Sequence, residues 1–130
     1  MKVLIIDPDW TFSRQAAGYL ESMAHLVVHQ AEKTKAIELA QRWQPDLLIV
    51  AAEYVEDGIL DDLKSAAKDA AVLLTEYMER YDRAWRAWQL GGDELLMKPV
   101  FQSADLHNAI VAARESAATG VRVNPMSESA

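Results

Sequence analysis

The sequence predicts an α/β domain in which five parallel strands form one sheet with helices on both faces. Short apolar runs alternate with amphipathic stretches five times along the chain. The apolar runs are continuous, which is typical of strands buried on both faces. Such an alternation of strands and helices favours a parallel sheet with right-handed crossovers.

The predicted strands are runs of β-branched and leucine residues. They are Val3–Ile6, Leu26–His29, Leu47–Val50, Val72–Leu74 and Leu95–Met97. The second run is the weakest, and Lys98-Pro99 stops the fifth.

The predicted helices place apolar residues three and four positions apart, so each has one face to bury. They run from Thr11 to Met23, Lys33 to Trp43, Ile59 to Ala67, Glu79 to Leu90 and Ser103 to Arg114. Gly91-Gly92 is expected to end the fourth helix, because glycine accepts the left-handed conformation at a helix C-terminus. Ser103 is expected to cap the fifth, and Tyr77 to lie in the loop before the fourth.

Length and composition suit one domain. The chain has 130 residues, and we expect the domain to cover residues 1–115. Residues 116–130 are rich in Ser, Thr, Gly, Asn, Pro and Glu, and we expect a disordered tail there. Neither a signal peptide nor a long apolar run is present, so we expect a cytoplasmic protein without a membrane partner.

Several kinds of chemistry are excluded or disfavoured. The chain has no cysteine, which excludes disulfides, thiolate zinc sites and cysteine nucleophiles. The net charge of −7 argues against direct nucleic-acid binding. The three histidines show no metal-binding spacing, and no hydrolase or phosphate-loop motif is present.

Residues at the ends of the predicted strands stand out instead. Asp7 follows the first strand, Ala51 the third, Thr75 the fourth and Lys98 the fifth. Sites in open parallel sheets form at the carboxyl ends of the strands. We therefore expect these four residues to lie close together.

This layout resembles the receiver (CheY-like) domain of bacterial response regulators, over Met1 to about Arg114. The pieces that carry the resemblance are Val3–Asp7, Pro45–Val50, Leu73-Leu74-Thr75 and Gly91 to Pro99. The resemblance implies a flavodoxin-like (βα)5 sheet with strand order 2-1-3-4-5, a role in two-component signal transduction, and a cis Lys98-Pro99 bond.

The resemblance also shows what the chain lacks. A receiver has two adjacent acids after its first strand, which hold magnesium, and an aspartate after its third strand, which accepts a phosphoryl group. Here the second acid is replaced by Pro8. The acceptor is replaced by Ala51, six residues after Pro45 as in the family. The aromatic residue that such domains carry on the fifth strand is replaced by Leu95.

The sequence therefore predicts a degenerate phosphorylation site, as in an atypical pseudo-receiver. Its residues are Asp7, Pro8, Ala51, Thr75 and Lys98. We expect no catalytic residues and no cofactor. Asp7, with Asp9 as a weak second candidate, offers too few oxygen ligands for Mg²⁺. We expect Lys98 to pair with Asp7 and Asp9 to cap the first helix.

The expected function is signalling by phosphorylation-independent protein–protein interaction rather than by enzyme activity. One alternative is a receiver phosphorylated on a non-standard acid, either Glu53, expected in the loop after the third strand, or Asp9. Another is a small-molecule-binding flavodoxin-like domain, although Asp7-Pro8-Asp9 is acidic where a ligand phosphate would lie.

The candidate partner surface lies on the fourth helix and fifth strand, at Tyr81, Trp85, Trp88 and Leu95. The resemblance points to this face and the fifth helix as a partner surface, through which a homodimer could also form. Exposed aromatics beside arginines are typical of interfaces, and the alternative is that the aromatics are core. Trp10 could either cover the acidic pocket or pack under the first helix.

Overall fold

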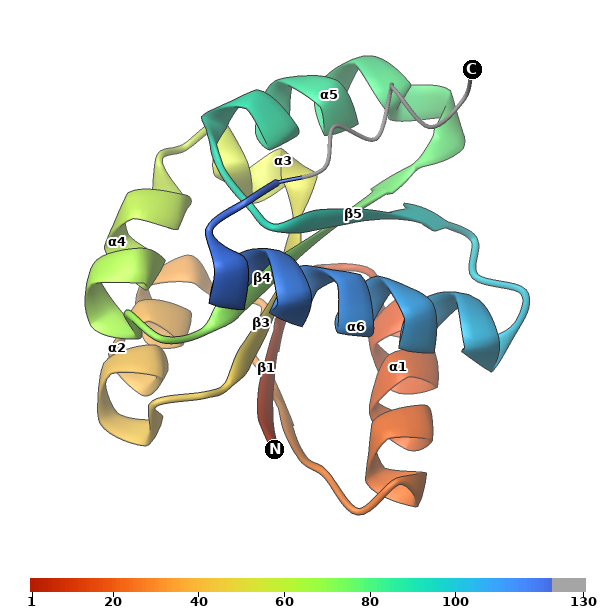
Figure 1. Ribbon diagram of the computed structural model, residues 1–130, viewed down its shortest axis with the longest axis horizontal. Helices are drawn as coiled ribbons and strands as arrows, with labels where there is room; N and C mark the ends of the chain where they lie inside the picture. The colour runs from red at the N-terminus through yellow and green to blue at the C-terminus, as the bar shows by residue number, and fades with distance from the viewer. Residues whose placement is uncertain (123–130) are drawn as a thin grey trace.

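The computed structural model describes residues 1–122, which form a five-stranded parallel sheet (Figure 1). The strands are β1 (Lys2–Ile6), β2 (Leu26–His29), β3 (Leu47–Ala51), β4 (Ala71–Tyr77) and β5 (Glu94–Lys98). Their order is β2-β1-β3-β4-β5, and every neighbouring pair is parallel. The predicted flavodoxin-like fold and strand order are confirmed.

Helices cover both faces of the sheet (Figure 1). They are α1 (Trp10–Ser22), α2 (Lys33–Trp43), α3 (Ala52–Val55), α4 (Ile59–Ala66), α5 (Tyr81–Leu90) and α6 (Ser103–Thr119), with a 3-10 turn at Met78–Arg80. One apolar core lies between the sheet and α1 and α6, and a second lies between the sheet and α2, α3, α4 and α5.

Alternation along each strand supplies both cores. Val3 and Ile5 of β1 face α1 and α6, whereas Leu4 and Ile6 face the opposite helices. All four side chains are fully buried. A strand with two buried faces needs apolar residues at successive positions, which is why the sequence shows continuous runs.

Two local expectations at the carboxyl end of the sheet were wrong. Ala52–Val55 forms the short helix α3, so Glu53 lies on a helix rather than in a loop. Four residues are too few to show a helical period, and burial of Ala52 and Val55 in the second core fixes this turn. Tyr77 is the last residue of β4 and not part of a loop.

The end of the chain also differs from expectation. Helix α6 continues to Thr119, past the boundary expected at residue 115, because Ser116 is buried and alanine-rich sequence continues the helix. Gly120 ends it in the left-handed conformation. Gln102, rather than Ser103, occupies the N-cap position, and its side chain makes no capping hydrogen bond. The part of the expected tail from 123 to 130 lies outside the described residues.

Helix α5 ends as predicted, at Leu90 before Gly91-Gly92. Gly92 has φ +93°, and a Cβ there would lie 2.7 Å from Cδ1 of Leu74. Both the backbone conformation and the close approach to β4 therefore require glycine. The Lys98-Pro99 peptide bond is cis, as the resemblance implied. None of the helices within residues 1–122 is both long and apolar enough to span a membrane.

Candidate functional site

The carboxyl edge of the sheet brings together the four strand-end residues that the sequence singled out. Ala51 pairs with Thr75 across β3 and β4, and Tyr77 pairs with Lys98 across β4 and β5. Asp7 follows Ile6, which pairs with Val50 directly before Ala51. Parallel register therefore places Asp7, Ala51, Thr75 and Lys98 along one edge, as expected.

Asp7 is fully buried, and hydrogen bonds occupy both of its carboxylate oxygens. Oδ2 accepts from Thr75 Oγ1 at 2.8 Å and from Lys98 Nζ at 3.0 Å. Oδ1 accepts from the backbone N–H of Asp9 at 2.9 Å. A buried carboxylate needs such partners, because leaving a charge unpaired in the interior is costly. The expected Asp7–Lys98 salt bridge is confirmed.

Asp9 has two roles at once. Its Oδ1 caps α1 by accepting from the N–H of Phe12 at 3.2 Å, which confirms the expected cap. Its Oδ2 turns into the site and accepts from Lys98 Nζ at 3.3 Å and from the hydroxyl of Tyr77. Partial burial raises the pKa of Asp9, but the bonds from Tyr77 and Phe12 and the charge of Lys98 together bring it below its ordinary value.

Sequence reasoning missed Tyr77 as a member of the site. Its hydrogen bond to Asp9 raises the pKa of the Tyr77 hydroxyl to about 12, with burial and the negative charge of Asp9 adding to the effect. The available signal was the strand period, because Thr75 and Tyr77 are two residues apart and so share one face of β4. Extending β4 by two residues would have placed this hydroxyl in the site.

Lys98 is enclosed by these groups, and only 4% of its side chain is exposed. Its ammonium contacts both Asp7 and Asp9 and lies 4.7 Å from the ring centroid of Tyr77 and 5.1 Å from that of Phe12. Cation–π attraction of this kind adds to the ionic contacts. The Lys98 ammonium thus points toward carboxylates and aromatic rings of the protein and not toward solvent. We call Asp7, Asp9, Thr75, Tyr77 and Lys98 the lysine cluster.

The acceptor position holds only a methyl group. Ala51 is 3% exposed, and Ala52 beyond it is fully buried. Glu53, the acid nearest in sequence, is exposed on α3. The ion pairs of Lys98 within residues 1–122 are to Asp7 and Asp9 and do not include Glu53. No carboxylate stands where the resemblance would place the acceptor.

The residues at this edge do not fit a magnesium ion. Mg²⁺ prefers octahedral coordination by oxygen ligands. Both oxygens of Asp7 already accept hydrogen bonds, Pro8 and Ala51 offer no side-chain ligand, and the Lys98 ammonium lies between the two acids. Over the described part of the chain, no three His, Asp or Glu side chains are grouped to hold a metal.

His29 is a second residue that the sequence analysis did not place at the site. Its Nε2 lies 2.7 Å from the backbone oxygen of Asp7, which connects β2 to the end of β1. Trp10 packs edge-on against His29, with ring centroids 4.4 Å apart. Trp10 remains 64% exposed, so it neither closes over the lysine cluster nor packs as core. No motif in the sequence signalled the His29 contact.

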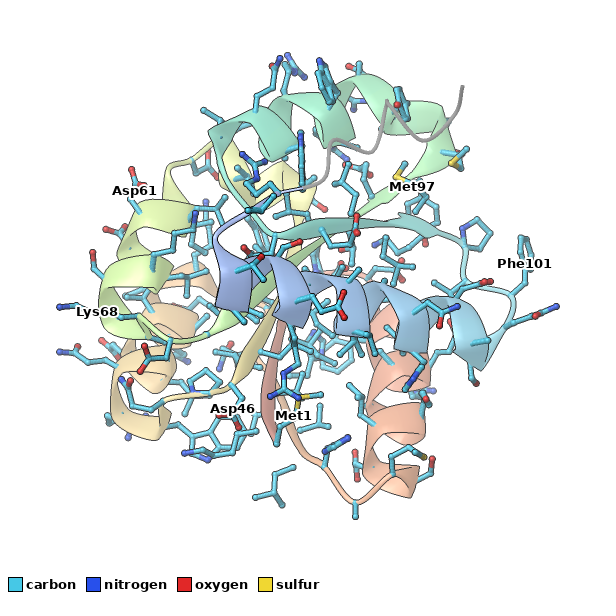
Figure 2. The ribbon with its side chains drawn as sticks, in the orientation of Figure 1. Met1, Asp46, Asp61, Lys68, Met97 and Phe101 are labelled. Atoms are coloured by element: carbon cyan, nitrogen blue, oxygen red, sulfur yellow. The ribbon has the colours of Figure 1, made fainter. Side chains whose placement is uncertain are left out.

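The hollow beside Lys98 is small. Phe12, Tyr77, Lys98, Pro99 and Val100 help to line a space of about 40 Å³, whereas pockets for small molecules usually enclose about 300 Å³ or more. A larger hollow of about 490 Å³ lies at the opposite edge of the sheet, where charged side chains line it. These are Asp46, Lys64, Lys68, Asp69, Asp93 and Arg114; Figure 2 labels Asp46 and Lys68.

The candidate partner surface is mixed. Tyr81 is exposed and Trp85 half-buried, while Leu95 packs partly against the second core. Trp88, by contrast, is only 5% exposed, and the guanidinium of Arg122 lies 3.8 Å from its ring centroid.

The arginines of α5 are held by carboxylates. Arg83 pairs with Glu76, which is buried at the end of β4. Arg86 reaches Glu56 at 3.0 Å, and Arg80 reaches Asp82 at 3.3 Å. Arg80, in the 3-10 turn before α5, and Arg83 and Arg86 on α5 therefore all take part in ion pairs.

Comparison with solved structures identifies the fold. The chain is similar to NtrX from Brucella abortus, solved with ATP (18% identity, TM-score 0.79, 92% of this chain and 27% of that one). It is also similar to a response regulator receiver domain protein from Clostridium thermocellum (24% identity, TM-score 0.73, 92% and 98% of the two chains). A third similar structure is a Burkholderia pseudomallei response regulator with a phosphorylated aspartic acid, calcium and citrate (21% identity, TM-score 0.72, 99% of this chain and 72% of that one).

The chain therefore has the fold of response regulator receiver domains. It spans only about a quarter of the length of the NtrX structure, so that protein's other properties do not transfer with the fold. No protein-family model matches the chain, and no curated protein sequence is significantly similar to it.

Proposed function

We propose that this protein is a pseudo-receiver, which signals through protein contacts without being phosphorylated and without enzyme activity. The observation that carries the proposal is the lysine cluster. Lys98, which would bind a phosphoryl group in an ordinary receiver, is buried against Asp7 and Asp9. The acceptor position beside it is the buried methyl group of Ala51.

The physical argument is one of charge and ligands. Phosphoryl transfer needs an attacking carboxylate and cations that neutralise the transferring group. This edge supplies no carboxylate at Ala51, and its one buried cation is shared by two acids. Without an accessible cation or metal ligands, the edge supports neither transfer nor a magnesium cofactor.

Intact-mass spectrometry tests the proposal directly. The protein is incubated with a small phosphodonor and Mg²⁺, and the Burkholderia receiver, which carries a phosphorylated aspartic acid in its structure, serves as the positive control. We expect no gain of a phosphoryl mass by this chain under conditions that phosphorylate the control. A stoichiometric gain would contradict the proposal.

The alternative is phosphorylation of a non-standard acid, and two variants identify which one. Glu53 is the better candidate sterically, because it is exposed, whereas Asp9 already accepts bonds from Lys98, Tyr77 and Phe12. A phosphoryl mass lost in E53Q but retained in D9N would establish Glu53 as the acceptor; the reverse pattern would establish Asp9. The small-molecule alternative has less support, because the hollow that Lys98 helps to line is only about 40 Å³.

We propose a bacterial, cytoplasmic setting and a protein partner that binds the face formed by α5, β5 and α6. Exposed Tyr81 and half-buried Trp85 are the aromatic side chains that this face offers. A homodimer through the same face is one form of such a contact. Sedimentation across a range of concentrations tests it: Y81A and W85A should weaken a dimer formed there, whereas K33A on α2 should not.

A further inference from the structure

We propose that the end of α5 carries a binding site for an arginine side chain, which Arg122 of the same chain fills until an arginine-bearing segment of a partner protein replaces it. The inference deepens the proposed function, because it names the chemistry of the partner. It starts from a residue that the sequence placed in a tail and the structure places on Trp88.

The site holds the guanidinium in three ways. The ring of Trp88 lies beneath it, at 3.8 Å from centroid to Cζ. One N–H donates to the backbone oxygen of Trp88, and Nη2 is also 3.4 Å from the backbone oxygen of Gly91. Burial lowers the pKa of the Arg122 guanidinium, and the negative charge of Asp93 nearby opposes that effect. Ring, carbonyls and carboxylate all favour a planar cation.

The carbonyls explain why this place attracts a cation. Trp88 O belongs to the last turn of α5, where helix carbonyls lack partners within the helix and the helix dipole is negative. Arginine suits the site better than lysine, because its planar group stacks on an aromatic ring while its several N–H groups donate in the ring plane. The site therefore selects a guanidinium and not merely a positive charge.

Within residues 1–122, the hydrogen bonds and the ring contact of Arg122 are all to the end of α5 and to Gly91. Helix α6 ends at Gly120, and Val121 beyond it is exposed. Figure 1 shows this last described segment running from the end of α6 toward α5. Because Arg122 lies beyond the end of α6, an outside arginine can compete with it for the Trp88 ring. Its removal would uncover Trp88, a residue type that often dominates the binding energy of interfaces.

The site also lies within the proposed partner surface. Trp88 is on α5, Gly91 leads into β5, and Arg122 follows α6. A partner that inserts an arginine here would contact all three elements. This continuity is the reason for choosing a partner protein, rather than a free small molecule, as the occupant.

The test uses the full chain labelled with 5-fluorotryptophan. Each of its four tryptophans gives a separate fluorine NMR signal. The W88F variant assigns the Trp88 signal. We expect R122A to shift that signal and to raise its solvent isotope effect, with R122K failing to restore it. The control is R114A, which removes an exposed arginine of α6 and should leave the signal unchanged.

The ligand probe is the peptide acetyl-Val-Arg-Val-amide, with the lysine peptide as its control. Because Arg122 competes at an effective concentration in the millimolar range, we expect the arginine peptide to bind R122A about ten-fold more tightly than the unchanged protein. It should return the Trp88 signal toward its original position, and the lysine peptide should not.

Four results would overturn the inference. Three of them are an unchanged Trp88 signal in R122A, an equal shift of that signal in R114A, and equal binding of the arginine and lysine peptides. The fourth is a dimer of the unchanged protein that dissociates in R122A, because a second copy of the chain would then be the occupant. No phosphodonor is present in the experiment. Its failure would therefore leave the outcome of the intact-mass test untouched, so failure of this inference and failure of the proposed function can be told apart.

Discussion

At the scale of single residues, the lysine cluster is a set of buried charges and hydroxyls that pair with one another. Lys98 satisfies Asp7 and Asp9, while Thr75 and Tyr77 donate to the same two carboxylates. Over residues 1–122, no buried side-chain nitrogen or oxygen is left without a hydrogen bond. Each charged group of the cluster therefore has its partners within the protein.

Breaking the cluster at Lys98 should be costly. We expect K98M to lower the free energy of unfolding by about 3–5 kcal/mol, because it leaves the buried Asp7 carboxylate without its cation. The double variant D7N/K98M should recover about 1–3 kcal/mol of that loss. Chemical denaturation measures both. The control K33M, which removes an exposed pair with Asp57, should cost less than about 1 kcal/mol. Equal losses for K98M and K33M would contradict the assigned role.

The Tyr77 hydroxyl provides a pH-dependent test. Its pKa of about 12 rests first on the hydrogen bond to Asp9, so D9N should bring it down toward the ordinary value of about 10. Because the pKa is raised by folding, this bond stabilises the protein below about pH 10 and its contribution is lost as the pH rises through 12. Carbon-13 NMR of labelled tyrosine rings measures the titration, and Y77F assigns the signal. A Tyr77 pKa unmoved by D9N would disprove the assigned cause.

At the scale of elements, the strands were the most predictable part and the short or terminal pieces the least. Continuous apolar runs mark the buried strands β1, β3 and β4, whereas β2 and β5 at the sheet edges are only partly buried and have weaker runs. Helix α3 was not predicted because a single helical turn is too short to show a helical period. Tyr77 was not assigned to β4 because a strand that ends in polar residues resembles a loop in sequence. Arg122 escaped because its tail-like composition carries no sign of the Trp88 ring that holds it.

The turn between α5 and β5 gives a matched pair of glycine substitutions. Gly92 has φ +93°, and an added Cβ would collide with Leu74, so G92A should destabilise the protein by about 2–4 kcal/mol. Gly18 lies exposed within α1 with open space around it. G18A should therefore stabilise the protein by about 0.5–1 kcal/mol. Thermal unfolding of both variants checks the pair, and a harmless G92A would contradict the packing described.

At the scale of the whole molecule, the receiver fold surrounds an edge where Ala51 and Pro8 stand in place of acids. The sheet order, both cores and the cis bond before Pro99 agree with the resemblance in the sequence. The losses at Pro8 and Ala51 could also be read from the sequence, because they are single positions in a known order. The contacts of Lys98 with Asp9, Tyr77 and Phe12 depend on distances between elements, so they could not be predicted from the sequence.

The most direct test of the central claim is a backbone NMR titration with Mg²⁺ and beryllium fluoride, which together mimic a bound phosphoryl group and its metal. The amides of Asp7, Thr75 and Tyr77 report on the lysine cluster, and those of α5 report on the proposed partner surface. We predict no saturable change at any of them, because Lys98 already occupies the acids and Ala51 offers no acceptor. Saturable shifts at Asp7 and Thr75 that spread to α5 would show a working phosphorylation switch and contradict the account.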